Sequence, residues 1–529
     1  MRCGGGCSTV TPSRLPSADV TQEQRTFVPN NEFGDFQTPS ALVSRVLQTL
    51  PDREWARILE PACGTGNFLT GCSKALPGAH VVGIEIQPEY VRAARLTPAE
   101  VIEADIFAMD LSKDLPWATG GPLLIVGNPP WVTNSQLSGL ESVNRPARAN
   151  LKNLSGYDAM TGSSNFDIAE YIWLKLITEL RDQRPVISML CKTQVARNVL
   201  EYCEKFRLPV SSATLHRIDA KKWFDAAVDA CLFTVEINTG PTVYVCDLFQ
   251  SLDTAEPSRR FGVIDGRLVA DIDAYGRSRL LDGACPLTWR QGMKHDAAPV
   301  MELRHHDSGP RTHAGEAVDI EDEYLYPLLK CTDVFRGRMG LRRWVIVPQK
   351  MLNEDTEHLA RTAPRLWAYL NANASALDRR KSSIYRNRPR FCVFGLGGYS
   401  FAPYKVAVSG LHKSAEFRLV ARVGSKPVFL DDTCYFLPFS DPHEAAVVAA
   451  LLRAGPAQDF FRAMAFWDSK RPITKKLLQR VDLLAVADAA DASEIADCAQ
   501  SLLGQLGATT SGEPVRAAIG RLRDTWNEG

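Results

Sequence analysis

The chain has 529 residues, and its 61 Lys and Arg residues balance 61 Asp and Glu residues to a formal net charge of zero. Hydrophobic residues make up 45% of it and charged residues 23%, a composition that is typical of a folded globular protein and excludes a largely disordered, collagen-like or coiled-coil chain. The length corresponds to roughly three domains at about 150 residues each. The neutral total also excludes a histone-like polycation.

The cysteines, the histidines and the first residues indicate the cellular setting. The 13 cysteines are an odd number without a repeated spacing, which favours a reducing compartment over a disulfide framework. Residues 1–30 are predicted to form a flexible leader, since they are rich in Gly, Ser, Thr, Pro and Gln and lack the apolar core of a signal peptide. No run approaches the ~18 apolar residues of a membrane span. Cys3 and Cys7 have no further ligands at zinc spacing nearby, and neither do the histidines at 305, 306 and 313, so we expect no metal site. Together these features predict a cytoplasmic protein without a membrane partner.

Short apolar runs alternate with helical stretches over residues 31–240. Helices are predicted at 41–50, 89–96 and 168–180, and strands at 57–59, 80–86, 101–106, 123–127, 185–191, 214–218 and 230–238. This alternation predicts a doubly wound, Rossmann-like α/β domain that ends near residue 240. Beyond it, short β-like runs precede a helical tail from about residue 444, so residues 241–529 are predicted to form one or two mixed α+β modules.

Glycines and acids stand at three successive predicted strand ends. The turn Cys63-Gly64-Thr65-Gly66 follows the first strand, Glu85 ends the second strand, and Asp105 lies at the end of the third. Glycine lets the backbone approach a ligand at the carboxyl edge of the sheet, and an acid at the second strand end accepts hydrogen bonds from a ribose diol. The turn is not the dinucleotide fingerprint, and no Lys follows it to form a P-loop. The pattern predicts a nucleoside-containing cofactor, and Glu85 alone fits either NAD or S-adenosylmethionine.

The fourth predicted strand runs into the loop Asn128-Pro129-Pro130-Trp131. Two prolines stiffen this loop and remove two backbone donors. The Asn128 side-chain oxygen and the Pro129 carbonyl can then accept from one substrate amino group, while the Trp131 ring stacks on a flat ring. This arrangement suits methylation of an aromatic amine by positioning and electrostatics, whereas the bland alternative is a Pro-Pro turn with an aromatic plug.

The order of these motifs resembles the gamma class of adenine-N6 DNA methyltransferases of restriction-modification systems. The resemblance covers roughly residues 33–240 and implies a class I methyltransferase domain that uses S-adenosylmethionine. It also implies that the Thr38-Pro39 segment closes over the cofactor and that Phe224, within residues 223–229, packs against an adenine flipped out of duplex DNA. Residues 241–529 would then be the target recognition domain.

The strand ends and the resemblance together give the predicted site. The cofactor-binding residues are Thr38, Pro39, Glu60, Pro61, Ala62, Gly64, Gly66, Glu85, Ile86, Asp105, Ile106 and Asn128. The catalytic residues are Asn128, Pro129, Pro130, Trp131 and Phe224.

Two features depart from the family pattern. Trp131 stands where Tyr or Phe is commoner, which keeps the stacking surface but alters the width of the pocket. The stretch 132–165 is long and carries Arg145, Arg148 and Lys152, which we expect to contact DNA, although a surface insertion without a role is the alternative.

Charge is distributed unevenly within the second half of the chain. Residues 1–240 hold 23 basic and 26 acidic residues, and residues 241–529 hold 38 and 35. Three runs without an acid, 336–350, 379–390 and 470–480, carry most of the local excess. Such runs suit phosphate contacts, although each taken singly also fits a solvated face. The predicted DNA contacts in these runs are Arg342, Arg343, Arg386, Arg388, Lys470 and Arg471, and Lys405 is added from residues 394–414, which resemble recognition domains of this group.

Two further functions are compatible with the motifs. The same loop occurs in methyltransferases that act on RNA or on a protein glutamine, although those chains tend to be shorter and lack a recognition domain. A DNA-recognition subunit is the second alternative, and a cognate restriction endonuclease or a defence-system subunit is a predicted partner of the enzyme.

Overall fold

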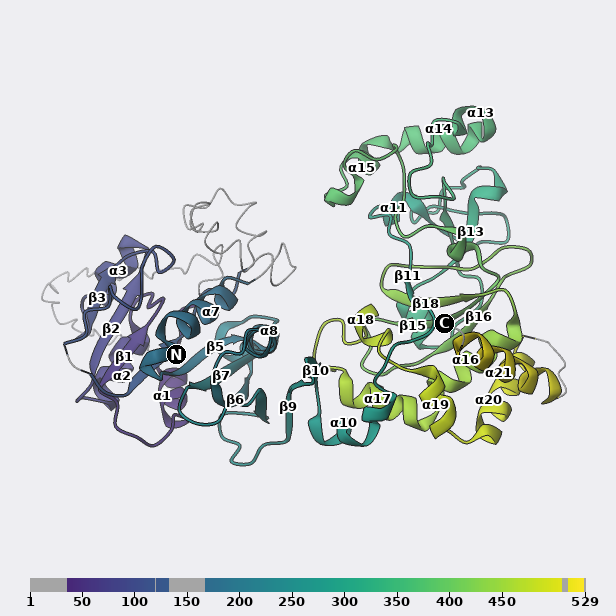
Figure 1. Ribbon diagram of the computed structural model, residues 1–529. Helices are drawn as coiled ribbons and strands as arrows, with labels where there is room; N and C mark the ends of the chain where they lie inside the picture. The colour runs from purple at the N-terminus through teal and green to yellow at the C-terminus, as the bar shows by residue number, and fades with distance from the viewer. Residues whose placement is uncertain (1–35, 119, 133–166, 507–511, 528–529) are drawn as a thin grey trace, which may run out of the picture.

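The computed structural model describes residues 36–118, 120–132, 167–506 and 512–527 (Figure 1). Two lobes lie side by side in Figure 1 and meet near β9, β10, α10 and α17. The first lobe contains the large sheet, and the second contains the smaller sheets and the C-terminal helices.

The first lobe is built on a ten-stranded sheet in the order β10-β9-β8-β6-β7-β5-β4-β1-β2-β3. Its strands are β1 Arg57–Glu60, β2 His80–Glu85, β3 Glu100–Glu103, β4 Leu123–Gly127, β5 Val186–Lys192, β6 Val210–Ile218, β7 Ala230–Ile237, β8 Val245–Phe249, β9 Arg259–Ile264 and β10 Arg267–Val269. Strands β3, β2, β1, β4 and β5 are mutually parallel, and β7 is antiparallel to both β5 and β6. The carboxyl ends of the parallel strands therefore share one edge of the sheet, where α/β proteins bind ligands.

Helices cover both faces of this sheet. They are α1 Ser40–Gln48, α2 Asn67–Ala75, α3 Pro88–Ala94, α7 Ile168–Leu180, α8 Thr193–Lys205 and α9 Ala220–Phe224. A hydrophobic core lies on each face of the sheet, and alternate residues of β4 belong to one or the other. Leu124 packs among side chains of α1 and α2, and Ile125 packs among side chains of α7 and α8. All five β4 residues are buried, as expected for a central parallel strand covered on both faces. The predicted doubly wound α/β class is confirmed.

The sheet extends beyond the predicted end of the domain near residue 240. Strand β8 pairs in parallel with β6, and β9 and β10 follow as antiparallel neighbours. The β8 residues alternate between half-buried and buried, so the strand itself has the expected period. Its membership of this sheet depends on pairing with a strand that lies more than 25 residues earlier in the chain, which a local pattern does not reveal.

The third strand is shorter than predicted. β3 ends at Glu103, whereas the sequence predicted 101–106. Beyond Glu103, only Ala104 N among the described residues still bonds to β2, at Glu85 O, and Asp105 Oδ1 then closes a turn by accepting a hydrogen bond from Phe107 N at 2.9 Å. Asp105 therefore lies in the turn after the strand.

The second lobe contains two four-stranded sheets, in the orders β11-β18-β15-β16 and β12-β14-β13-β17. Their strands are β11 Arg290–Gln291, β12 Glu302–Arg304, β13 Leu325–Leu329, β14 Arg343–Ile346, β15 Tyr404–Ser409, β16 Arg418–Ala421, β17 Phe429–Leu430 and β18 Cys434–Phe439. Short helices accompany them: α10 Ile272–Ser278, α11 Ala298–Met301, α12 Cys331–Phe335, α13 Leu359–Thr362, α14 Pro364–Ala372 and α15 Ala374–Asp378. The predicted mixed α+β character of this half is confirmed.

The chain ends in a group of helices, as the sequence predicted from about residue 444. They are α16 Pro442–Arg453, α17 Gly455–Met464, α18 Lys475–Leu478, α19 Leu483–Ala489, α20 Ala492–Gly504 and α21 Gly512–Asn527. The α16 helix is buried along most of its length and packs on β15, β16 and β18. Within the described ranges, every helix is too short or too polar to cross a membrane.

Candidate active site

The glycine turn after β1 adopts a backbone conformation that favours glycine. Gly64 and Gly66 have φ angles of 52° and 88°. A Cβ atom on Gly66 would lie 2.9 Å from Thr97 Cγ2 and 3.2 Å from the Ala94 backbone, so a side chain has no room there. Gly66 is also the N-cap of α2, so the helix begins directly after the turn, and the glycine backbone lies at the carboxyl edge of the sheet.

Backbone amides hold the Glu85 carboxylate at the end of β2. Gly64 N donates to Oε2 at 2.8 Å, while Ile86 N and Gln87 N donate to Oε1 at 2.9 and 2.8 Å. Oε1 therefore accepts two hydrogen bonds and Oε2 accepts one from the glycine turn, and together they fix the side chain in place.

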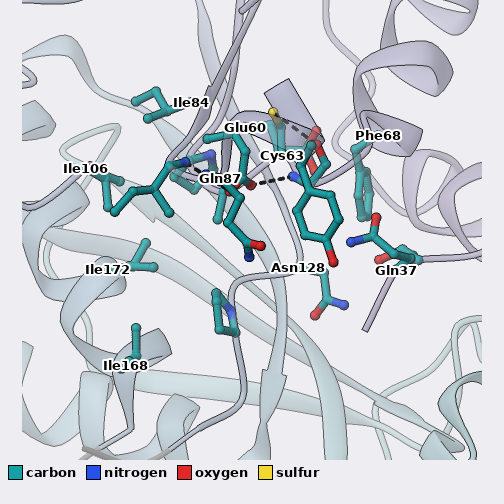
Figure 2. A pocket seen from close by; sticks show the side chains of 18 of the residues that line it. Gln37, Glu60, Cys63, Phe68, Ile84, Gln87, Ile106, Asn128, Ile168 and Ile172 are labelled. Atoms are coloured by element: carbon teal, nitrogen blue, oxygen red, sulfur yellow. Dashed lines mark hydrogen bonds between the residues drawn. The ribbon is translucent and has the colours of Figure 1, made fainter. Parts of the chain in front are cut away.

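These strand ends surround a pocket (Figure 2). Figure 2 shows Ile84, Ile106, Ile168 and Ile172 along one side and Gln37, Phe68 and Asn128 along the other. Ten of the predicted cofactor residues line this pocket: Thr38, Glu60, Pro61, Ala62, Gly64, Glu85, Ile86, Asp105, Ile106 and Asn128. Pro39, at the start of α1, and Gly66, within the turn, are not among the lining residues.

Glu60 is a buried acidic residue in the lining of the pocket. Burial, and secondarily the negative charge of Glu85, raises the pKa of Glu60 well above its ordinary value. Its Oε2 atom is buried and has no hydrogen-bond partner among the described residues. A cationic ligand would satisfy this oxygen. The amino group and the sulfonium centre of S-adenosylmethionine are cationic, so the residues present fit that cofactor.

Hydrogen bonds connect residues 37 and 38, just before α1, to the glycine turn and to the start of α2. Gln37 Oε1 accepts from Thr65 N at 3.2 Å and from Thr65 Oγ1 at 2.8 Å. Asn67 Nδ2 donates to Thr38 O at 2.9 Å. Sequence reasoning placed Thr38 here but missed Gln37 and Asn67, because their roles depend on contacts with residues about 30 positions away.

The Asn128 side chain has a defined orientation. Its Nδ2 donates to Phe36 O at 2.9 Å, which turns the Oδ1 atom the other way. Oδ1 is buried and has no partner among the residues that the structure describes. An acceptor without a donor is therefore available in the loop that the sequence singled out.

Lys192 and Asp167 lie beside the loop formed by residues 128–131. Lys192 Nζ donates to Trp131 O at 2.8 Å and to Asp167 Oδ2 at 2.6 Å. Asp167 is also the N-cap of α7, accepting from Ala169 N at 3.1 Å. Neither residue was predicted, since each is an ordinary charged residue in the sequence and only the fold brings the two together.

Three aromatic rings gather beside Asn128. The Trp131 and Phe224 ring centroids are 5.2 Å apart, and Phe36 lies 5.5 Å from Trp131 and 5.7 Å from Phe224. Trp131 is only 5% exposed. The structure thus brings together the two predicted stacking residues, and it adds Phe36 to them.

The predicted DNA contacts differ in where the structure places them. Arg145, Arg148 and Lys152 lie outside the described residues. Exposed side chains are found for Arg342, Arg386, Arg388 and Lys470. Lys470 and Arg471 line a groove between the lobes, which also includes Lys192 and the segment 226–230 that follows Phe224.

Two predicted DNA contacts are placed differently. Lys405 is 2% exposed within β15, where Nζ donates to Ala402 O at 2.8 Å and burial lowers the pKa of the amine to about 7. A side chain so enclosed does not reach DNA, so that prediction is wrong in this structure. Arg343 forms an ion pair with the buried Asp333, which binds its guanidinium to the protein itself.

A parallel sheet with an antiparallel β7, a glycine turn after β1, an acid at the end of β2 and another after β3 define a class I S-adenosylmethionine-dependent methyltransferase. Among solved structures, the type IIL restriction-modification enzyme MmeI in complex with DNA has a similar fold, with a TM-score of 0.50 and 12% identity over 94% of this chain and 76% of that one. No family model matches the chain.

The sequence comparisons narrow the class to a family. The type II methyltransferase M.NspV of Nostoc sp. (strain ATCC 29411 / PCC 7524) is 38% identical over 478 residues, which are 86% of this chain and 97% of the relative. The type II methyltransferase M.CvrRI of Paramecium bursaria Chlorella virus XZ-6E is 36% identical over 104 residues, 20% of this chain and 26% of that relative. The chain belongs to the type II methyltransferases, the DNA methyltransferases of restriction-modification systems.

Proposed function

We propose that this methyltransferase modifies the N6 amine of an adenine that is flipped out of duplex DNA. The observation that carries the proposal is the buried Asn128 Oδ1 atom, oriented by Phe36 and left without a donor at the mouth of the cofactor pocket. An exocyclic amine supplies the missing donor. The order of the motifs, which resembles that of the gamma class, favours adenine over cytosine.

The residues divide the work between the two substrates. Glu85 and the glycine turn would hold the ribose and Asp105 the adenine of S-adenosylmethionine, and Glu60 would face its cationic end. The cofactor supplies an electrophilic methyl group. Asn128 Oδ1 and the Pro129 carbonyl would accept both hydrogens of the target amine and draw its lone pair out of the ring. Attack by this nitrogen on the methyl carbon would break the methyl–sulfur bond, leaving S-adenosylhomocysteine, and the amine would release one proton to solvent.

The aromatic cluster serves the flipped base. Extruding a base costs a few kcal/mol of stacking, which contacts in the protein must replace. The Trp131 and Phe224 rings, which meet edge to face at 75°, offer such surfaces beside Asn128. The remaining predicted contacts, including Lys470 and Arg471 along the groove, would hold the DNA backbone. A separate restriction endonuclease or defence-system subunit would share the recognition sequence.

The test is the chemical identity of the product. The protein is incubated with tritiated S-adenosylmethionine and duplex DNA, the DNA is digested to nucleosides, and label is expected in N6-methyladenine. Asn128→Ala is expected to lower the rate by about 100-fold or more, because one lost transition-state hydrogen bond has that effect. Cofactor affinity is measured in parallel, because Asn128 also lines the cofactor pocket, and the loss of rate should exceed any loss of affinity.

Asn371→Ala is the matched control, since Asn371 is an exposed asparagine on α14. Its activity should equal that of the unmodified protein. Label in N4-methylcytosine would refute the choice of adenine. Label in RNA or in a protein glutamine would support the alternative substrates, and DNA binding without any transfer would support a recognition subunit.

A further inference from the structure

Three arginines surround one carboxylate where the two lobes meet. Arg197 Nη2 donates to both Asp468 oxygens at 2.7 and 2.8 Å, and Arg217 Nη2 donates to Oδ2 at 2.8 Å. Arg259, at the start of β9, lies close enough for Asp468 and Arg217 to influence its pKa. The cluster therefore contains three guanidinium groups and one shared acceptor.

The Asp468 carboxylate accepts hydrogen bonds from Arg197 and Arg217 and, among the described residues, none from Arg259. In the part of the chain that the structure describes, the Arg259 side chain makes no hydrogen bond or ion pair, and its buried Nε atom has no acceptor. The Nε atoms of Arg197 and Arg217 are likewise buried without acceptors. Burial lowers the pKa of Arg259, so the protein holds this charge at a cost in stability. Such a group requires an explanation other than folding.

A hollow opens beside this arginine. It is lined by Arg217, Arg259, Lys413, Trp467, Gln250 and Ser258, with Asp229 and Asp468 at the side that it shares with the groove between the lobes. Lys413 is exposed, and its Nζ atom donates to Ser469 O at 2.9 Å. Cations from both lobes thus converge on one hollow.

The hollow lies on the same edge of the sheet as the active site. Arg217 is near the end of β6, which runs parallel to β8, and Arg259 begins the antiparallel β9. Strand β5, which is antiparallel to β7 as β6 is, ends at this edge with Lys192, the residue that contacts the catalytic loop. DNA bound at Asn128 would pass along this edge, over the groove lined by Lys470 and Arg471.

We propose that Arg259, with Arg217 and Lys413, binds a phosphate of the DNA backbone next to the groove. This inference rests on the proposed function, because it takes duplex DNA as the substrate. A planar guanidinium fork matches phosphate oxygens, and a phosphodiester would supply the acceptors that Asp468 does not. The contact positions the DNA and does not read its sequence.

The test measures the dependence of duplex DNA affinity on salt concentration. Each neutralised phosphate contributes about 0.9 to the slope of log K against log salt concentration. Arg259→Gln in the full chain is expected to reduce the slope by about that amount and to weaken binding equally to specific and unrelated duplexes. Arg259→Lys, which keeps the charge, should retain most of the slope.

Arg260→Gln is the control, since Arg260 is the next residue of β9 and is exposed and paired with Asp273. Its slope should match that of the unmodified protein. The melting temperature of DNA-free Arg259→Gln should equal or exceed the unmodified value, because the substitution removes a charge that burial disfavours. A lowered melting temperature with an unchanged slope would show a structural role and overturn the proposal.

The possible results distinguish a failure of the phosphate site from a failure of the proposed adenine methylation. An unchanged slope in Arg259→Gln, in a protein that still methylates adenine, overturns the phosphate site alone. A reduced slope, in a protein that labels cytosine, supports the phosphate site while the choice of adenine fails. If the unmodified protein binds no DNA, both proposals fail.

Discussion

At the scale of single residues, Lys405 shows how strongly burial alters a side chain. Its ammonium group, ordinarily with a pKa of 10.5, lies in β15 beside the Phe436 ring at 5.7 Å, and burial lowers the pKa to about 7. Because the pKa of Lys405 is lower in the folded protein than in the unfolded chain, the contribution of this residue to the free energy of unfolding is fully present above pH 10.5. That contribution is lost as the pH falls towards 7.

We expect the free energy of unfolding to rise between pH 7 and pH 9.5 and Lys405→Met to flatten this rise. One pKa unit corresponds to about 1.4 kcal/mol, so the variant should be more stable at pH 7 by an amount on the order of 4 kcal/mol. Urea denaturation at several pH values measures the effect. Lys475→Met, at an exposed lysine of α18, should leave the curve unchanged, and parallel curves for Lys405→Met and the unmodified protein would refute the explanation.

Single residues also show what a sequence reveals about a site. Glu85 and Asn128 were predictable because strand ends place side chains at one edge of a sheet, so their position in the chain gives their position in space. Lys405 was mispredicted because the resemblance of residues 394–414 to recognition domains does not show whether a side chain is buried. Its strand, β15, lies between β16 and β18, which come from later parts of the chain.

At the scale of elements, the turn between β1 and α2 is the most constrained. The φ angle of Gly66 is 88°, and any Cβ would lie 2.9 Å from Thr97 Cγ2. Gly66→Ala is expected to destabilise the protein by about 1–3 kcal/mol, the usual cost of a strained backbone, and to weaken cofactor binding at least several-fold.

Thermal unfolding and equilibrium dialysis with S-adenosylmethionine test this. Gly78→Ala is a suitable control, because a Cβ there meets nothing within 4 Å. Equal affinity and stability in the two variants would mean that the turn does not define the cofactor site.

Elements differ in how well the sequence predicts them. The bounds of β4 and α7 match the prediction, 123–127 and 168–180, because an uninterrupted apolar run marks β4 and the Asp167 cap marks the start of α7. β3 was overestimated because the apolar period continues through Ile106 while the Asp105 turn has already ended the strand. Local pattern determines that an element exists, and side-chain capping determines where it stops.

At the scale of the whole molecule, Asp468 connects the lobes. It is 271 residues from Arg197, whose side chain is 3% exposed and also lies 4.0 Å from the Phe466 ring centroid. Burial alone would raise the pKa of Asp468, but Arg197 and Arg217 hold it below its ordinary value. No pattern in the sequence pairs these residues, since only the assembled lobes bring them together.

Asp468→Asn is expected to lower the free energy of unfolding by about 3–5 kcal/mol, because it leaves Arg197 buried without a counter-charge. Urea denaturation measures the loss. Asp459→Asn removes an exposed partner of Arg462 and should cost less than about 1 kcal/mol. If the two variants were equally stable, the ion pair would not hold the lobes together.

The assembled molecule is expected to modify adenine in duplex DNA. Single-molecule sequencing of DNA from cells that produce the protein, compared with cells that produce Asn128→Ala, tests it most directly. We predict modified adenines at one recurring sequence in the first sample and none at that sequence in the second. Modified cytosines at the recurring sequence, or modified adenines that persist with Asn128→Ala, would contradict the account.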